Sequence, residues 1–307
     1  MATLTGTNCT TSRLNIGMDS CQVIEGLLTG FYRVKKGYTI DLATVTMNKV
    51  WIDEQIQLGL IEPFVGCFDA IAETPDPTTE ESQSGITSVV RQGKPTITAT
   101  FKKGKAYQKA SFSSNSNDVY DYFLVYDSNV IEGALNGTIL KGFDGGMFNT
   151  NGYIMNNGAN SASTVIKFQL KDSYEFNVQS TFITDFDFNV NTGVNGIIDL
   201  VMVGRADVSD GKIYVKPTWL HNAQFATEGM ATANFYATLN GVADTLTGTA
   251  VYNSTTKEYA LTPTTALSTS SQSWVVRTNK ASLSDNPVAD VGGKFYKGVT
   301  AAFVPVA

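Results

Sequence analysis

The sequence predicts a mainly β protein with one helix. Apolar and polar residues alternate with a period of two along most of the chain after residue 96, which is typical of half-buried strands. Charged residues make up only 16% of the chain, against about 25% in an average globular protein, and Ser, Thr, Asn and Gly take their place. Only one stretch has apolar residues at helical spacing. These features are typical of a β protein with many turns.

The first sixty residues predict a pair of strands and then the helix. Short apolar runs separated by glycines lead to a turn at Gly37, which is expected to join two strands as a hairpin or pair. Asp41 is a suitable N-cap for a helix over about 42–58, where apolar residues recur at helical spacing. Gly59 and Pro63 follow this stretch and are expected to end the helix.

The middle of the chain predicts a sheet. Residues 72–88 are polar, acidic and contain two prolines, so a long loop is expected there. Alternating patterns or fully apolar runs then predict strands at residues 96–101, 119–126, 165–170, 174–179, 181–188 and 197–203. Gly/Asn-rich segments between them are expected to be loops. The pattern therefore predicts a mostly antiparallel sheet with the helix packed on it.

A second domain is expected after Asp210-Gly211, with residues 1–209 forming the first domain and 210–307 the second. Short strands are predicted at regular intervals, at residues 212–216, 233–239, 247–252, 258–262, 273–277 and 294–303. Turns such as Asn240-Gly241 separate them. Regularly spaced short strands over about 100 residues indicate a small immunoglobulin-like (Ig-like) β-sandwich.

Bulk properties narrow the class of protein. The net charge of −6 and the pI near 4.9 argue against a dedicated nucleic-acid binder, although DNA could slide past an acidic surface without being captured. The N-terminus lacks the basic and apolar regions of a secretory signal, and no apolar run reaches the ~18 residues of a membrane span. Cys9, Cys21 and Cys67 match no zinc pattern, so free thiols in a protein made in a reducing cytoplasm are expected.

No motif predicts a catalytic residue, a metal ligand or a cofactor. His221 is the only histidine, follows no nucleophile-elbow motif, and is expected to be a surface or packed residue. Residues 185–191 carry acids at alternate positions but lack the glycine and glutamate of a calcium loop, so a strand with water-facing acids is expected. Trp51, Trp219 and Trp274 are scattered, and packing roles suffice for them, so no aromatic groove for a paired-carboxylate glycosidase is indicated. The chain is predicted not to be an enzyme.

Two adjoining runs of opposite charge are the candidate subunit-contact residues. The acidic run is Asp69, Glu73, Asp76, Glu80 and Glu81, and the basic run is Arg91, Lys94, Lys102, Lys103, Lys105 and Lys109. They could be two solvated faces, or the acidic loop of one subunit could lie against a basic hairpin of its neighbour and fix the register. A nucleic-acid contact by the basic run is less favoured, because Tyr107 is the only aromatic residue close to its lysines. The contact hypothesis predicts that association weakens as salt rises.

Several motifs in residues 20–205 carry a family resemblance. They are Gly37-Tyr38-Thr39-Ile40-Asp41, Gln92-Gly93-Lys94-Pro95, Thr98-Ala99-Thr100-Phe101-Lys102-Lys103-Gly104 and the run from Val119 to Asp127. Together they resemble tail-tube and head-to-tail ring proteins of tailed phages that infect Bacteroidota, including the crAss-like group.

The resemblance implies a tail-tube-like antiparallel β domain followed by an Ig-like domain. It also implies a homo-oligomeric ring or tube, sixfold or twelvefold, around a channel for DNA in the phage tail or head-to-tail connector. Its partners would be copies of itself, neighbouring tail or connector proteins of the virion, and genomic DNA only in passing, with no membrane contact.

Two other functions are alternatives. The chain could be another virion protein, such as a capsid decoration or fibre-base subunit whose Ig-like domain binds cell-surface glycans. It could also be a polysaccharide-binding or polysaccharide-active protein of the host cell surface, which the absence of a secretory signal disfavours.

Overall fold

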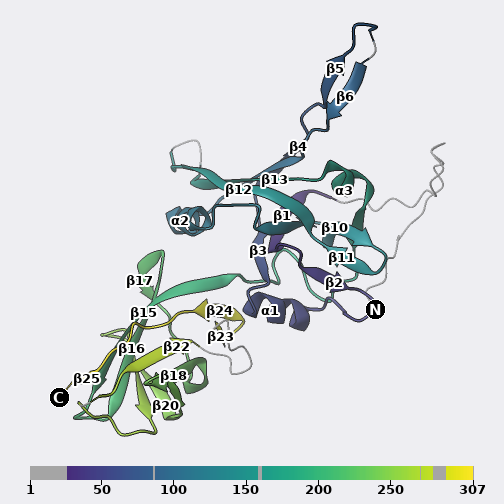
Figure 1. Cartoon of the computed structure of the whole chain (residues 1–307). Coiled ribbons are helices and arrows are strands. Elements are labelled where there is room, and N and C mark those ends of the chain that lie inside the picture. The colour runs from purple at the N-terminus through teal and green to yellow at the C-terminus, as the bar shows by residue number, and fades with distance from the viewer. Residues whose placement is uncertain (1–25, 86, 158–160, 270, 279–287, 307) are drawn as a thin grey trace. The chain divides into compact units, whose positions relative to one another are not determined.

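The computed structural model describes residues 26–306 apart from residues 86, 158–160, 270 and 279–287 (Figure 1). Its architecture is mainly β, as predicted. The chain divides into two compact units: unit 1 is Met1–Gln55 with Leu60–Val194, and unit 2 is Ile56–Gly59 with Asn195–Ala307. The division thus lies at residues 194 and 195 and not at the expected 209 and 210. The reason is that β15 (Ile197–Asp207) pairs along most of its length with β16 (Lys212–Trp219), so that an antiparallel hairpin spans the expected boundary.

Unit 1 contains a 12-stranded sheet. Its strands are β1 (Leu28–Lys35), β2 (Thr39–Asp41), β3 (Ile61–Val65), β4 (Asp69–Glu73), β7 (Thr96–Phe101), β8 (Ser116–Asn117), β9 (Tyr120–Tyr126), β10 (Val130–Asn136), β11 (Ile139–Lys141), β12 (Phe143–Ile154), β13 (Ser163–Leu170) and β14 (Ser180–Ile183). Pairing runs from β1 through β9, β12, β13 and β7 to β4, and β3, the strand directly before β4, pairs back with β1. The segment that connects β3 to β4 is hydrogen-bonded to both β1 and β7. The Cys67 N–H donates to the Thr29 carbonyl at 2.8 Å, and the Phe68 N–H donates to the Thr100 carbonyl at 2.7 Å.

Aromatic side chains form much of the core of this sheet, and β1, β3, β4, β7, β9, β12 and β13 all contribute to the cluster. Alternation along each strand directs one set of side chains inward. The Phe31 ring centroid lies 4.5 Å from that of Phe168 and 4.9 Å from that of Phe64, and Tyr122 stacks on Phe168 at 4.4 Å. Burial of each such side chain contributes about 1.5–3 kcal/mol. The strands predicted at residues 96–101, 119–126 and 165–170 are confirmed as β7, β9 and β13.

The prediction of a single helix was wrong, because the described residues form three: α1 (Lys49–Gln57), α2 (Lys105–Ser113) and α3 (Ser173–Val178). The helix predicted over 42–58 begins later than expected. Asp41 caps a turn instead, since its side chain accepts a hydrogen bond from the Ala43 N–H at 3.0 Å. Asn48 caps α1, and its side-chain oxygen accepts from the Trp51 N–H at 2.9 Å. Two isoleucines of α1, Ile52 and Ile56, are fully buried.

Three strand or loop predictions in unit 1 were also wrong. Residues 174–179 belong largely to α3, because the Asp172 carboxylate accepts from the N–H groups of Tyr174 and Glu175 and caps a helix. The strand predicted over 181–188 ends at Ile183, and Asp187 beyond it accepts from the Lys49 N–H at 2.9 Å. The predicted long loop over 72–88 contains instead the hairpin of β5 (Thr78–Glu81) and β6 (Thr87–Arg91).

The two strands that flank Gly37 form as predicted but do not pair with each other. Gly37 has the left-handed φ of 75° that its turn requires. β1 pairs with β3 and β9, whereas β2 pairs with β11, so the chain crosses between neighbouring parts of the sheet at this turn.

Unit 2 contains an eight-stranded and a three-stranded sheet. The larger has β15, β16, β17 (Asn222–Ala226), β20 (Leu246–Asn253), β21 (Glu258–Pro263), β23 (Val288–Val291), β24 (Lys294–Lys297) and β25 (Pro305–Val306), and the smaller has β18 (Phe235–Leu239), β19 (Val242–Asp244) and β22 (Trp274–Thr278). A short 3₁₀ helix, η1 (Thr232–Asn234), precedes β18. Most pairings are antiparallel, but β24 and β25 run parallel to β15. Five of the six short strands predicted for this part of the chain are present, whereas the one predicted over 294–303 ends at Lys297 as β24.

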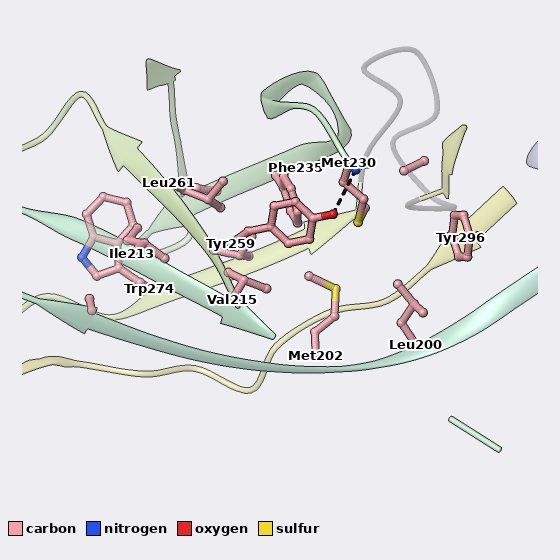
Figure 2. Packing of buried hydrophobic residues seen from close by; sticks show 14 residues of the cluster. Leu200, Met202, Ile213, Val215, Met230, Phe235, Tyr259, Leu261, Trp274 and Tyr296 are labelled. Atoms are coloured by element: carbon pink, nitrogen blue, oxygen red, sulfur yellow. Dashed lines mark hydrogen bonds between the residues drawn. The ribbon is translucent and has the colours of Figure 1, made fainter. Parts of the chain in front are cut away.

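The core of unit 2 is built around Trp274 and Tyr259 (Figure 2). Trp274 is fully buried, in agreement with the packing role predicted for it. The Tyr259 hydroxyl accepts from the Met230 N–H at 3.0 Å and donates to the Thr227 carbonyl at 3.0 Å, which satisfies two buried backbone groups. Strands of both sheets thus share one apolar interior.

The outer edge of β20 is blocked within the chain. The Thr232 hydroxyl donates to the Gly248 carbonyl and accepts from the Ala250 N–H, both at 2.8 Å. Such side-chain contacts prevent an edge strand from recruiting another strand.

Candidate interaction surfaces

The predicted contact residues lie along one antiparallel ribbon and the helix that follows it. β4 pairs with β7, and beyond this pairing β5 pairs with β6, with Glu80 opposite Ser88. All five acids lie on the outgoing strand of the ribbon: Asp69 and Glu73 on β4, Asp76 between β4 and β5, and Glu80 and Glu81 on β5. The basic residues lie on the returning strand and beyond: Arg91 ends β6, Lys94 precedes β7, Lys102 and Lys103 follow β7, and Lys105 and Lys109 are on α2. The acidic and basic runs are thus neighbours along one ribbon.

The outer part of this ribbon, residues 78–91, is here named the acidic hairpin. It forms a two-stranded sheet of its own, separate from the 12-stranded sheet (Figure 1). Every residue from Ile71 to Val90 whose burial the structure describes is exposed. Within the hairpin, two of the residues so described are apolar: Val89 is 54% and Val90 61% exposed. Since successive residues of a strand point to opposite faces, each face of the hairpin carries one exposed valine.

A close backbone contact marks the joint between the acidic hairpin and the β4–β7 pairing. Gly93 approaches Pro75 so closely that a Cβ at residue 93 would lie 1.7 Å from the Pro75 carbonyl oxygen. Only glycine permits this approach, because real Cβ contacts do not fall below 3.0 Å. The contact therefore fixes how the hairpin leaves the rest of the ribbon.

α2 presents a basic surface, here named the α2 face, which comprises Lys102, Lys103, Lys105, Lys109 and Phe112 with the nearby Phe68. The helix forms because Ala106, Tyr107, Ala110 and Ser111 recur at helical spacing, and these side chains are half-buried or buried. The Tyr107 ring lies 5.4 Å from that of Phe101. The four lysines of this surface are exposed.

Three of these lysines lie over aromatic rings. The Lys102 ammonium is 3.2 Å from the centroid of the Phe68 ring, that of Lys105 is 4.6 Å from Tyr153, and that of Lys103 is 5.7 Å from Tyr107. Such cation–π contacts contribute about 0.5–1 kcal/mol each at exposed sites and hold the ammonium groups in place. Of these rings only that of Tyr107 could be placed near the lysines from the sequence, because the other two come from other elements of the fold.

No ion pair in the described part of the chain joins an acid of the ribbon to a lysine of residues 102–109. In the register, the acids of β4 and β5 lie opposite Thr and Ser. The two charged surfaces therefore form no ion pair with each other among the described residues, although both belong to the same ribbon and the helix that follows it.

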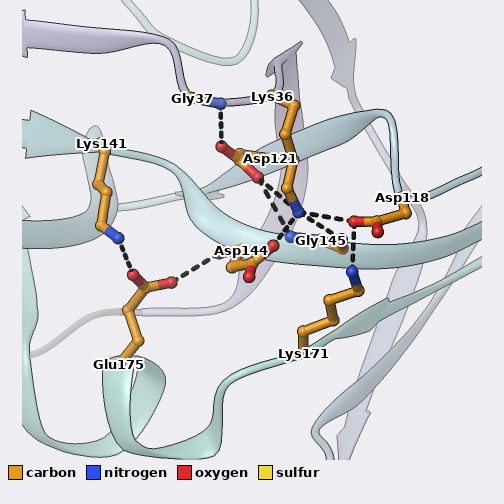
Figure 3. A network of polar contacts seen from close by, with 9 residues as sticks. All are labelled: Lys36, Gly37, Asp118, Asp121, Lys141, Asp144, Gly145, Lys171 and Glu175. Atoms are coloured by element: carbon orange, nitrogen blue, oxygen red, sulfur yellow. Dashed lines mark hydrogen bonds and ion pairs between the residues drawn. The ribbon is translucent and has the colours of Figure 1, made fainter.

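A separate polar network lies where β1, β9 and β12 meet, and Figure 3 shows its members. The Lys36 ammonium donates to Asp118 at 2.9 Å and to the Gly145 carbonyl at 3.0 Å, and also pairs with Asp144. It lies 3.5 Å from the buried Asp121 carboxylate. These groups satisfy one another, so we assign the network a structural role in joining the ends of the strands.

The pKa values of this network follow from its contacts. Hydrogen bonds from Lys171 and Lys36 lower the pKa of Asp118 from 3.8 to about 2. Burial raises the pKa of Asp121, against the opposing effect of backbone N–H donors and of Lys36. Burial alone would lower the pKa of Lys36, but hydrogen bonds to its carboxylate partners outweigh this effect and raise it. Among the carboxylates of this network, Asp118 is therefore the one whose contacts most clearly favour its charged form.

The residues considered for chemistry in the sequence are divided between the two units. His221 is half-buried in the turn between β16 and β17. Burial and the nearby Asp69 raise the pKa of the Cys67 thiol to about 11, so this free cysteine is a neutral thiol. Cys9 and Cys21 lie outside the described residues. Within the described ranges no group of three or more His, Cys, Asp or Glu residues could hold a metal ion.

Comparison of the chain with protein-family models, with curated proteins and with solved structures found no match. No helix in the part of the chain that the structure describes has the length and apolar character to cross a membrane.

Four apolar residues of these surfaces, Phe68, Phe112, Val89 and Val90, were not predicted from the sequence. Phe68 and Phe112 belong to the α2 face and are 64% and 59% exposed. Val89, on the acidic hairpin, stands in a run of β-branched residues, which was a signal for the strand that the loop prediction overlooked. The basic segment was predicted as a hairpin, but residues 105–113 are helical.

Proposed function

We propose that the chain is a non-enzymatic structural protein of a tailed-bacteriophage particle. It assembles with copies of itself into a ring or tube in the tail or head-to-tail connector and surrounds a channel for DNA. In this proposal unit 1 is the tail-tube-like domain and unit 2 is the Ig-like module. The motifs between residues 20 and 205 that resemble such virion proteins support it, and most of that span belongs to unit 1.

The acidic hairpin is the observation that carries the proposal. An isolated two-stranded hairpin is marginally stable in water, and its unpaired edges can recruit another chain. In unit 2 the edge of β20 is blocked by Thr232, whereas the hairpin has two edges without a partner strand among the described residues. With exposed valines on both faces, this element is suited to be completed by another subunit.

The charge of the protein suits a channel for DNA. With a net charge of −6, an assembled ring would repel phosphate groups on average, so DNA could pass without being captured. Lys102 and its neighbours would then be engaged in contacts between protein subunits. Neighbouring tail or connector proteins would be the other partners.

Electron microscopy of the purified full-length protein tests this proposal. The expected result is closed rings, or tubes built from stacked rings, with a central hole. Particles of one chain at every concentration, together with binding to cell-surface glycans, would overturn it in favour of the glycan-binding alternative.

A further inference from the structure

We propose that the acidic hairpin of one copy docks on the α2 face of a second copy. This inference rests on the proposed function and names the contact that would hold the assembly together. It concerns a contact between identical chains in which two different surfaces meet.

The α2 face is exposed and ready to bind an acidic, partly apolar partner. Its four lysines have no carboxylate partner among the described residues, and the ammonium groups of Lys102 and Lys105 are held over Phe68 and Tyr153. Phe112 adds an apolar side chain that is 59% exposed on the same helix. The surface therefore combines positive charge with aromatic rings.

The acidic hairpin has the complementary composition on either of its faces. Partners across the hairpin share a face, so Glu81 lies on the same side as the Thr79–Val89 pair. Glu80, opposite Ser88, lies on the other side, which is also the side of Val90. Whichever face docks, it offers one carboxylate and one valine to the lysines and rings of the α2 face.

The geometry of the ribbon disfavours this contact within one chain. β7 has six residues and runs from the hairpin side of the ribbon toward α2. The length of this strand alone places the acidic hairpin and the α2 face of one chain about 20 Å apart. A contact between two different surfaces of identical subunits is heterologous, and repetition of it gives either a closed ring or an open filament. The placement of the two surfaces thus fits the ring or tube of the proposed function.

Charge-reversal variants test the inference. In Lys105→Glu with Lys109→Glu the helix α2 becomes acidic like the hairpin, and in Glu80→Lys with Glu81→Lys the hairpin becomes basic like the α2 face. Each double variant alone should associate at least tenfold more weakly than the wild type, as measured by sedimentation velocity, with circular dichroism to verify folding. An equimolar mixture should regain the assembly, because every hairpin then meets an α2 helix of opposite charge on the other variant.

A matched control separates this contact from a general effect of charge. Lys294→Glu with Lys297→Glu changes the net charge equally at two exposed lysines of unit 2 and should leave assembly unchanged. If the wild type is monomeric throughout, the proposed function fails. If the wild type assembles and the folded Lys105/Lys109 variant assembles equally well, or the mixture fails to recover, only the docking contact is refuted. Loss of binding to a labelled DNA duplex with assembly intact would reassign the α2 face to nucleic acid.

Discussion

Substitution of Gly93 by alanine should misdirect the acidic hairpin without unfolding the protein. The added Cβ would lie 1.7 Å from the Pro75 carbonyl oxygen, and contacts of this kind require at least 3.0 Å, so the two strands must separate by about 1.3 Å at the joint. Gly93 has no left-handed φ, so the effect is one of space and not of backbone conformation. Overpacking of this size costs about 1–3 kcal/mol.

The cost should appear in assembly. If the hairpin must keep its native direction to reach a neighbouring subunit, a penalty of about 1–3 kcal/mol weakens association roughly 5- to 150-fold. Sedimentation equilibrium measures this constant. Hydrogen exchange at Thr87–Arg91 should also accelerate, because the pairing of β5 with β6 lies next to the altered joint.

Gly104→Ala is the matched control. Gly104 lies at the start of α2, has a φ of −74°, and a Cβ there would meet nothing within 4 Å. It should leave both assembly and exchange unchanged. If Gly93→Ala associates like the wild type and its hairpin amides exchange at the wild-type rate, the argument from the Pro75 contact is wrong.

Three further predictions concern stability. Phe31→Ala should lower the free energy of unfolding by about 3–5 kcal/mol in urea denaturation, because it opens a cavity among stacked rings, whereas Phe112→Ala at an exposed site should change it by less than about 0.5 kcal/mol. Tyr259→Phe should cost about 1–3 kcal/mol in the same assay, since it leaves the buried Met230 N–H without its acceptor. The pKa of Asp118 falls from 3.8 to about 2 in the folded protein, so this carboxylate stabilises the fold above pH 3.8 and loses that contribution as the pH falls toward 2. Asparagine tolerates the left-handed φ of 58° at this position. Asp118→Asn should therefore flatten the dependence of the free energy of unfolding on pH in that interval. An unchanged dependence would contradict the stabilising role of the Asp118 carboxylate.

Local patterns sufficed to predict the mainly β class and many individual strands. β7 has the alternation of burial that its sequence predicts, and β9 is buried along most of its length, as expected of a strand with partners on both sides. Tertiary pairing was not predictable in this way. The core of the sheet depends on contacts such as Phe31 with Phe168, whose rings approach only after strands far apart in the sequence have paired.

Two helices were missed although the sequence contained their signals. Asp172 followed three residues later by Glu175 is an N-terminal helix signature, but the alternation of aromatic residues after it was taken as a strand. In α2, Lys105 and Lys109 stand at the i, i+4 spacing of one helix face, which the emphasis on their charge obscured. The joint at Gly93 could not be predicted, because it depends on the approach of Pro75 from the opposite strand.

The candidate surfaces were only partly evident from the sequence. The acidic and basic runs were identified residue by residue, and each gathers on one part of the ribbon or the helix that follows it. Their aromatic components were not identified, since Phe68 and Tyr153 reach the lysines from other elements. The charge of a segment follows from its sequence alone, whereas the aromatic rings that contact its lysines are brought there by the fold.

Sedimentation velocity of the purified wild-type chain at low and at high salt tests the central claim most directly. If the protein is an assembly subunit held together by the acidic hairpin and the α2 face, it sediments at low salt as a closed oligomer of defined mass. Because exposed ion pairs are screened, that oligomer then dissociates as salt rises toward 1 M. A single chain at all salt and protein concentrations would contradict the claim that this protein is built to assemble.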